Sequence, residues 1–232
     1  MTCILVANLD KEVVIAVDKR VTLIGEDGTR VPICDNEEKI VRTGVGIVTG
    51  CGSVAMLDPV KDVLRNFGFA TTNEVFKLIQ DTREYYSEAN AGSPRLEADL
   101  AETSWLFTYP TIVDEKSLTR VVYFHQSVSR EKFAVVSEGR VICFPSGFTL
   151  EQAQEIQNRL QEVVTNALTS LPYDQAKGKV IIAMVRLMHE VSQTSNSVSP
   201  ACDVAIISGK EVFIASGVGV ESECFTFSTM LG

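Results

Sequence analysis

The chain has 232 residues, of which 45% are hydrophobic and 22% are charged, and its formal net charge is −9. This length and apolar fraction suit a single domain, residues 1–232, with a sizeable hydrophobic core. The acidic balance and the lack of Lys/Arg-rich runs argue against nucleic acid as a partner, and the apolar runs are too short to cross a membrane.

Apolar runs rich in β-branched residues predict strands in the first part of the chain, followed by helices. The strands are expected at residues 2–7, 13–17, 39–41 and 45–48. A polar, glycine-containing stretch at 25–30 interrupts them. The helices are expected at residues 53–66 and 72–90, and a polar loop at 91–97 follows.

The second part of the chain repeats this order of strands, then helices. The strands are expected at residues 105–107, 120–124, 133–136 and 140–144. Thr149 and Gln152 have capping-box spacing and open a long helix, and a second helix is expected at 173–192. Two strands, at 203–207 and 212–215, follow the helices.

This order predicts an α+β fold in which two sheets stack face to face and a helix pair covers each outer face. Such a four-layer αββα sandwich buries all the apolar surfaces. Two small α+β domains are the alternative, but no Pro/Gly/Ser-rich linker separates the halves, which favours one domain.

The N-terminal sequence and the cysteines indicate a cytoplasmic protein without a metal or cofactor. No basic segment followed by a long apolar run is visible, so we expect no signal peptide. The six cysteines form no CxxC pair and are interpreted as free thiols in a reducing compartment. His125 and His189 are isolated from any ligand-like spacing.

Thr2 directly follows Met1 and is a candidate nucleophile. If Met1 is removed, Thr2 carries both a hydroxyl that can attack and an α-amine that can accept its proton, because the reference pKa of the amine is roughly 7.7–8.0. Many ordinary proteins also begin Met-Thr, so this feature alone does not identify an enzyme.

Asp18 and Lys39 stand at strand ends, where buried charges need partners. A lysine beside a catalytic amine would lower the pKa of that amine by charge repulsion, and Asp18 could hold the lysine charged. Their alternative roles are a turn residue and an ordinary surface lysine.

Two turns between a strand and a helix could supply backbone donors. Gly50-Cys51-Gly52-Ser53 precedes the first helix, and its N–H groups could stabilise an oxyanion. Ser146-Gly147 precedes the helix that begins near Thr149. Both stretches could equally be plain tight turns.

In this order, the residues resemble proteasome β-type subunits and the related bacterial ring proteases. From Thr2 to Thr22 the match needs no gap, and the family's Asp-x-Arg-x-Thr motif reads here as Asp18-Lys19-Arg20-Val21-Thr22. The family lysine falls on Lys39 and the oxyanion turn on Gly52. The resemblance covers nearly the whole chain and is most specific in its first third.

The sequence departs from the family at several positions. A short insertion precedes Lys39, Met56 stands where the family often has Asp, and the family's Gly-Ser-Gly turn reads Pro145-Ser146-Gly147. The family's Asp-x-x-Ser matches Asn196 to Ser199 only loosely. No propeptide precedes Thr2, and the N-terminal helix of α-type subunits is missing, which favours the catalytic type.

The resemblance implies a set of site residues and a substrate. The implied catalytic residues are Thr2, Asp18, Lys39, Ser146 and Gly52, with Asn196 and Ser199 as weaker candidates. The implied substrate-binding residues are Val21, Thr22, Gly50 and Val54. The expected partners are a peptide or protein substrate and further copies of the chain in a homo-oligomer, possibly a ring, and no docking signature for an ATPase is evident.

Three functions fit this sequence. The first is an N-terminal threonine peptidase or amidase that works through an acyl-enzyme. The second is a peptide ligase or acyl transferase that passes the same acyl group to an amine. The third is a non-catalytic, proteasome-like ring or scaffold subunit, because a fold does not by itself imply activity.

Overall fold

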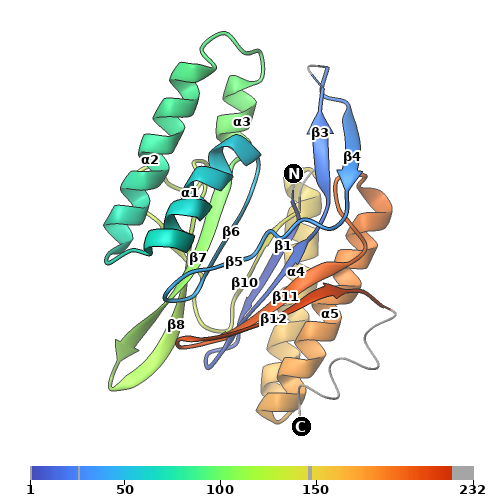
Figure 1. Ribbon diagram of the computed structural model, residues 1–232. Coiled ribbons are helices and arrows are strands. Elements are labelled where there is room, and N and C mark those ends of the chain that lie inside the picture. Colours follow the sequence, from blue (N-terminus) through green and yellow to red (C-terminus); the bar gives the residue numbers. More distant parts are fainter. Residues whose placement is uncertain (1, 26, 146–147, 221–232) are drawn as a thin grey trace.

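The computed structural model describes residues 2–25, 27–145 and 148–220 (Figure 1). The strands are Ile4–Asn8 (β1), Val13–Asp18 (β2), Val21–Ile24 (β3), Arg30–Cys34 (β4), Val41–Arg42 (β5), Ile47–Cys51 (β6), Ser104–Val113 (β7), Lys116–Phe124 (β8), Ala134–Val135 (β9), Val141–Phe144 (β10), Cys202–Ser208 (β11) and Glu211–Val218 (β12). The helices are Val54–Phe67 (α1), Thr72–Ala89 (α2), Leu96–Glu102 (α3), Leu150–Ser170 (α4) and Tyr173–Thr194 (α5).

The first sheet has five antiparallel strands in the order β10-β1-β2-β11-β12. Every residue of β1 and β2 is buried, which explains why both read as continuous apolar runs rather than as alternating patterns. The pairing of Ile4 with Val17 brings the start of β1 beside the end of β2. Thr2 and Asp18 are thereby positioned at the same end of the sheet.

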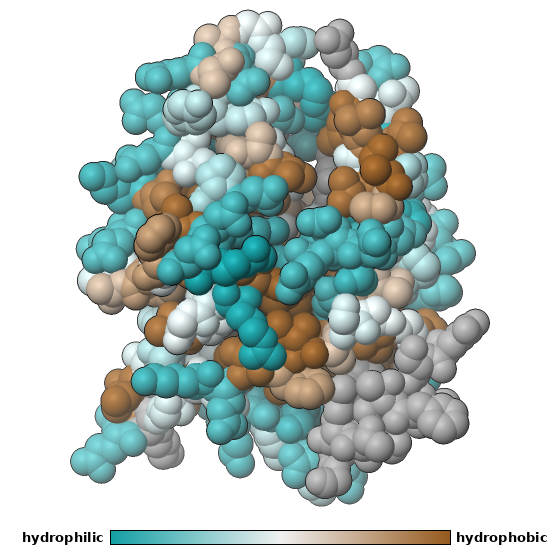
Figure 2. Space-filling view, viewed as in Figure 1, coloured by the Kyte–Doolittle hydropathy of each residue, from teal (hydrophilic) through white to brown (hydrophobic). Residues whose placement is uncertain are grey.

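The second sheet has the antiparallel order β5-β6-β7-β8-β9, and β6 leads into α1 through Gly52 and Ser53. Strands β3 and β4 form a separate two-stranded sheet, which projects beside the N-terminus in Figure 1. Leu23, Val31 and Ile33 on it are 61%, 54% and 61% exposed. They contribute to the hydrophobic patch at the upper right of Figure 2.

The buried apolar side chains form three clusters. One joins the first sheet to α4 and α5, with members such as Leu5, Leu160 and Met184. Another contains residues of both five-stranded sheets, such as Ile15 and Leu106. The third joins the second sheet to α1 and α2. In Figure 1, α1 and α2 accordingly lie on one side of the sheets, and α4 and α5 on the other.

The prediction of a four-layer αββα sandwich is wrong. The antiparallel sheets are accompanied by a third, two-stranded sheet and by a fifth helix, α3, that the prediction did not contain. Strands β3 and β4 flank the polar stretch predicted at 25–30, and α3 begins within the loop predicted at 91–97. All described side chains of β3 and β4 are half-buried or exposed, and α3 has no buried residue. Such elements lack the apolar periodicity on which the prediction depended.

The four helices expected from the sequence are present. The capping box at the start of α4 is confirmed: the Gln152 backbone N–H donates to Thr149 Oγ1 at 3.3 Å, and the Thr149 N–H donates to Gln152 Oε1 at 2.9 Å. On α2, Tyr85 is exposed, whereas Phe76 packs against Phe124 and Phe133.

Candidate active site

A cavity of about 530 Å³ opens where the first strand, the β3 strand and the N-terminal part of α1 meet. Several candidate residues from distant parts of the sequence line it. These are Thr2, Val21, Thr22, Lys39, Gly50, Gly52 and Val54. The fold therefore brings together most of the residues that the sequence suggested, although it does not by itself assign them a role.

Thr2 lies at the start of the first sheet and is only 4% exposed, yet it lines the cavity. Its neighbour Cys3 is held by Asp18 in two ways. The Asp18 backbone N–H donates to the Cys3 carbonyl at 3.1 Å, and the Cys3 N–H donates to Asp18 Oδ1 at 2.7 Å. These bonds fix the backbone immediately after Thr2.

Lys39 reaches the same place from the segment before β5. Its Nζ donates to Asp18 Oδ1 at 3.1 Å, to Asp18 Oδ2 at 3.2 Å and to the Arg20 carbonyl at 2.6 Å. Both charged side chains are buried, and Asp18 is completely so. Sequence analysis placed Lys39 at the head of a strand, whereas that strand begins at Val41.

Burial and the ion pair shift the pKa of Lys39 in opposite directions. Removal of the ammonium from water is the larger effect and lowers the pKa of Lys39, whereas the neighbouring Asp18 carboxylate opposes that lowering. Asp18 also accepts the Arg20 N–H at 2.8 Å and the Ser199 N–H at 3.4 Å. Several donors thus satisfy a carboxylate that has no contact with water.

The turn from β6 into α1 forms the opposite wall, and both of its glycines are sterically required. Gly52 has φ +115°, and a Cβ there would lie 2.4 Å from the Thr103 Cα. A Cβ at Gly50 would lie 2.5 Å from both Leu57 Cδ2 and the Ser104 carbonyl. The backbone of this wall can therefore approach a ligand without side chains in between.

The residues suggested for substrate binding also lie along this cavity. Val21 and Thr22 come from β3, and Val54 begins α1 and is 55% exposed. The Thr22 Oγ1 atom is buried and has no hydrogen-bond partner among the described residues. A buried hydroxyl oxygen without a partner is unusual, and it lies in a residue that lines the cavity.

The weaker candidates lie behind the site rather than in the cavity. Ser199 is buried, its N–H faces Asp18, and its Oγ accepts the Lys19 N–H at 2.7 Å and donates to the Ala201 carbonyl at 2.6 Å. The Asn196 carbonyl accepts from Arg20 Nη1 at 3.2 Å. Ser146 lies outside the described residues.

Two features of this cavity were not predicted from the sequence. The first is the role of Arg20, named above only as part of a motif, whose guanidinium makes a two-pronged ion pair with Asp35, with both N–O distances 2.7 Å. The second is Lys61 on α1, which is only 8% exposed and lines the cavity. Its spacing from Leu57 and Leu64, four and three residues away, places it on the apolar face of the helix and could have revealed it.

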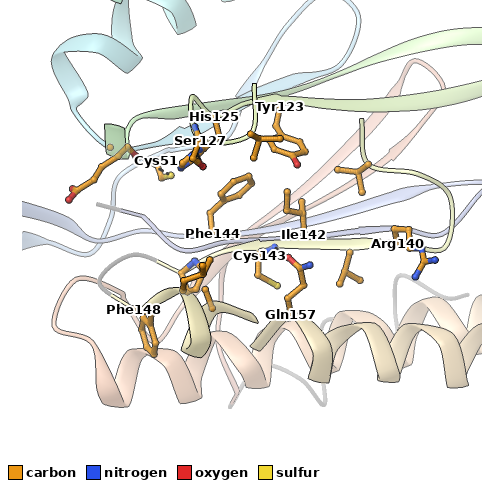
Figure 3. Close-up of a pocket in the computed structure, with 18 of the residues that line it drawn as sticks. Cys51, Tyr123, His125, Ser127, Arg140, Ile142, Cys143, Phe144, Phe148 and Gln157 are labelled. Atoms are coloured by element: carbon orange, nitrogen blue, oxygen red, sulfur yellow. Dashed lines mark hydrogen bonds between the residues drawn. The ribbon is translucent and has the colours of Figure 1, made fainter. Parts of the chain in front are cut away.

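A larger cavity, of about 840 Å³, begins on the other side of the Gly52 turn and shares Gly52 and Glu102 with the first. Figure 3 shows the aromatic rings of Tyr123 and Phe144 within it, and their centroids are 5.5 Å apart. Ser127 Oγ lies 2.7 Å from His125 Nδ1. This short-range contact belongs to the turn after β8, so it needs no catalytic explanation.

No family model matches the chain, and no curated protein matches it either. A solved structure of an Anbu (Gly-1) mutant from Hyphomicrobium sp. strain MC1 is similar, with a TM-score of 0.61 and 14% identity. The similarity covers 100% of this chain and 95% of that one.

A second similar structure is Anbu (ancestral beta-subunit) from Yersinia bercovieri, with a TM-score of 0.57 and 12% identity over 99% of this chain and 91% of that one. Identities this low show a related fold alone. They correct the resemblance to proteasome β-type subunits and bacterial ring proteases, because Anbu is a distinct, proteasome-like family. A TM-score of 0.61 likewise indicates a related fold rather than the regular sandwich that was predicted.

None of the helices in the described residues is both long and apolar enough to cross a bilayer. Within residues 2–25, 27–145 and 148–220, no group of three or more His, Cys, Asp or Glu side chains is arranged to hold a metal ion.

Proposed function

We propose that this protein is an amide hydrolase, acting on peptides, in which Thr2 is the nucleophile after removal of Met1. The observation that carries this proposal is the position of Thr2 in a cavity whose wall contains Lys39, a buried lysine paired with the fully buried Asp18. A buried charge pair beside a nucleophile in a cleft is typical of sites at which pKa values are adjusted for catalysis.

In this mechanism Thr2 supplies both the nucleophile and the base. Its Oγ forms a bond to the substrate carbonyl carbon while its free α-amine takes the hydroxyl proton. The amine then gives that proton to the leaving nitrogen as the C–N bond breaks, and an acyl-enzyme remains. Water attacks this ester, with the amine again as base, and releases the acid.

In this mechanism Lys39 lowers the pKa of the Thr2 α-amine. The Asp18 carboxylate favours the ammonium form of Lys39 and, together with the Arg20 carbonyl, fixes its direction. A positive charge near the Thr2 amine disfavours protonation of that amine, so more of it is available as a base near neutral pH. Lys39 therefore acts on the base and need not take the proton itself.

The β6–α1 turn provides the second catalytic element. We assign the Gly52 N–H as a donor to the oxyanion that develops as Thr2 attacks. The sterically required glycine supports this role, because a side chain at Gly52 would displace the turn against Thr103. Thr22 and Val21 on the opposite wall would hold the substrate backbone.

Cys3 is the nearest rival nucleophile, and its surroundings argue against it. The side chain is fully buried, and it does not line the cavity. Burial, first, and the Asp18 carboxylate, second, raise the pKa of the Cys3 thiol well above its usual value. The reactive thiolate is therefore strongly disfavoured at neutral pH.

The test is intact-mass analysis after reaction with a peptide epoxyketone, an electrophile that needs a hydroxyl and a free amine on the same residue. Protein that lacks Met1 should gain the mass of one inhibitor, and Thr2→Ala and Met1-retaining protein should gain none. Thr2→Ser should still react, because it keeps both groups, and Cys3→Ala should react normally. Modification of Thr2→Ala would disprove the proposed nucleophile.

We also propose that the protein works as one domain in a homo-oligomer. The exposed apolar side chains of β3 and β4 support self-association, because isolated monomers rarely leave such a patch in water. The active-site proposal does not depend on whether this oligomer is a closed ring or whether it binds an unfoldase.

A further inference from the structure

Lys61 is an unusual residue in the wall of the Thr2 cavity. It lies on α1, only 8% exposed, between Leu57 and Leu64, which are both buried. Lysine is almost never buried without a partner. The Lys61 stem is buried, and its Nζ, which is not among the fully buried atoms, keeps some contact with solvent. A lysine at this position in an otherwise apolar helix face therefore needs an explanation.

Four positively charged side chains line the cavity, and three of them are paired. Arg20 binds Asp35 at 2.7 Å, Lys39 binds Asp18 at 3.1 Å, and Arg95 binds Asp99 at 3.2 Å. The fourth is Lys61. Among the described residues, no carboxylate lies within 4.0 Å of its Nζ and no hydrogen bond from it is formed.

The nearest acids do not neutralise Lys61. Asp58, one turn earlier on α1, and Glu37, across the cavity, are exposed to solvent. Burial is the largest influence and lowers the pKa of Lys61, Asp58 raises it, and the like charge of Lys39 lowers it further. The cavity therefore has an incompletely compensated cation in its wall, where a bound anion would be stabilised.

We propose that Lys61 is a specificity-determining residue, which selects substrates bearing a side-chain carboxylate, Glu or Asp, next to the amide that is cleaved. The proposal rests on the proposed hydrolase function of the same cavity. A substrate carboxylate would give Lys61 the charge-assisted partner that the protein withholds from it.

The lining of the cavity offers Lys61 no competing buried acid among the described residues. The other acids that line it are exposed or, in the case of Asp99, paired with Arg95. Gly50 lines the cavity with backbone alone, because a Cβ there would meet Leu57 Cδ2 and the Ser104 carbonyl at 2.5 Å.

The kinetic test uses fluorogenic peptides that are identical except for Glu, Gln or Leu immediately before the cleaved amide. Wild-type protein should cleave the Glu peptide about ten- to a hundredfold more efficiently than the Gln peptide, the range expected for one charge-assisted hydrogen bond. Lys61→Met should lose this preference, with similar efficiencies for the Glu and Gln peptides. Lys77→Met, which removes an exposed lysine from α2, should keep the preference.

A binding measurement separates this proposal from the proposed function. Thr2→Ala protein, with or without Lys61→Met, is titrated with dye-labelled Glu and Gln peptides and followed by fluorescence polarisation. Tighter binding of the Glu peptide that depends on Lys61 would support the specificity role even if no peptide were ever cleaved.

Three outcomes would overturn the proposal. These are cleavage without a Glu preference, a Glu preference that survives in Lys61→Met, and failure of the Glu peptide to bind more tightly than the Gln peptide. Lys61→Gln serves as a second variant if Lys61→Met does not fold, because it removes the charge but keeps a polar end. Cleavage with any of these results would leave the hydrolase function intact.

Discussion

Replacement of Asp18 by Asn should destabilise the protein far more than the loss of an ordinary ion pair. Asp18 is completely buried, and its two oxygens accept from Lys39, Cys3, Arg20 and Ser199. Asn keeps the shape but removes the charge, and it turns one acceptor into a donor. Whichever way the amide points, its NH₂ group meets a backbone N–H that donated to the lost oxygen.

The size of the loss in stability follows from the unpaired Lys39 ammonium that the substitution leaves in the core. Lys39 keeps its ammonium in a buried position without a counter-charge, and breaking one partner of a buried pair costs ~3–5 kcal/mol. The matched control is Asp35→Asn, which breaks the pair with Arg20. The Asp35 side chain is 46% exposed, so this loss should reduce the free energy of unfolding by only ~0–1 kcal/mol.

The assay is urea unfolding monitored by circular dichroism. The free energies of unfolding are compared with one common value for their dependence on urea concentration. The double variant Asp18→Asn/Lys39→Met should recover part of the loss, because it removes the stranded charge. The penalty of Asp18→Asn should also shrink as pH rises through the lowered pKa of Lys39, since a neutral amine needs no counter-charge. A penalty no larger than that of Asp35→Asn, or no recovery in the double variant, would refute the reasoning.

Four further predictions concern the site and the assembly. Lys39→Ala should reduce peptide turnover by several orders of magnitude with the fold intact by circular dichroism. Lys61→Met should raise the free energy of unfolding by about 1 kcal/mol at neutral pH. Because burial lowers the pKa of Lys61 in the folded protein, the free energy of unfolding of the wild type should rise as pH rises through that pKa. Urea titrations of the variant should show no such rise. Gly52→Ala should cost ~2 kcal/mol more than Gly28→Ala, because both have positive φ but only Gly52 would meet Thr103. Light scattering should give a mass well above the 25.4 kDa of one chain, and a monomer at micromolar concentration would contradict self-association.

The core of the fold could be predicted from the sequence because its signals are local. Strands β1 and β2 are continuous apolar runs, and α4 begins with a capping box, so each is recognisable without any tertiary information. The β3–β4 sheet and α3 were missed because these short elements contain no buried residue and so carry no clear apolar period in the sequence. The regular sandwich was inferred from the strong elements alone, and that is why it was wrong.

The sequence could predict which residues belong to the site, but not the hydrogen bonds that hold them. The family resemblance implied that Thr2, Lys39 and Gly52 belong to one site, and the fold brings them to one cavity. The role of Asp18 as a four-way acceptor, by contrast, depends on Ser199, which arrives from 181 residues away. No local pattern encodes a contact of that separation, so the loose match at Ser199 could not be weighed from sequence.

Two buried lysines near the same cavity differ in a way that bears on function. Lys19 is buried, but its Nζ donates to both oxygens of Asp203 and to Ser216, so its charge is fully compensated within the protein. Such a pair needs only a structural explanation. Lys61 has no such partner among the described residues, although Met or Leu would pack at its position without loss of hydration. Lys61 lines the cavity and has no counter-charge there, so a ligand could supply the missing charge, and this is why Lys61 rather than Lys19 carries the specificity proposal.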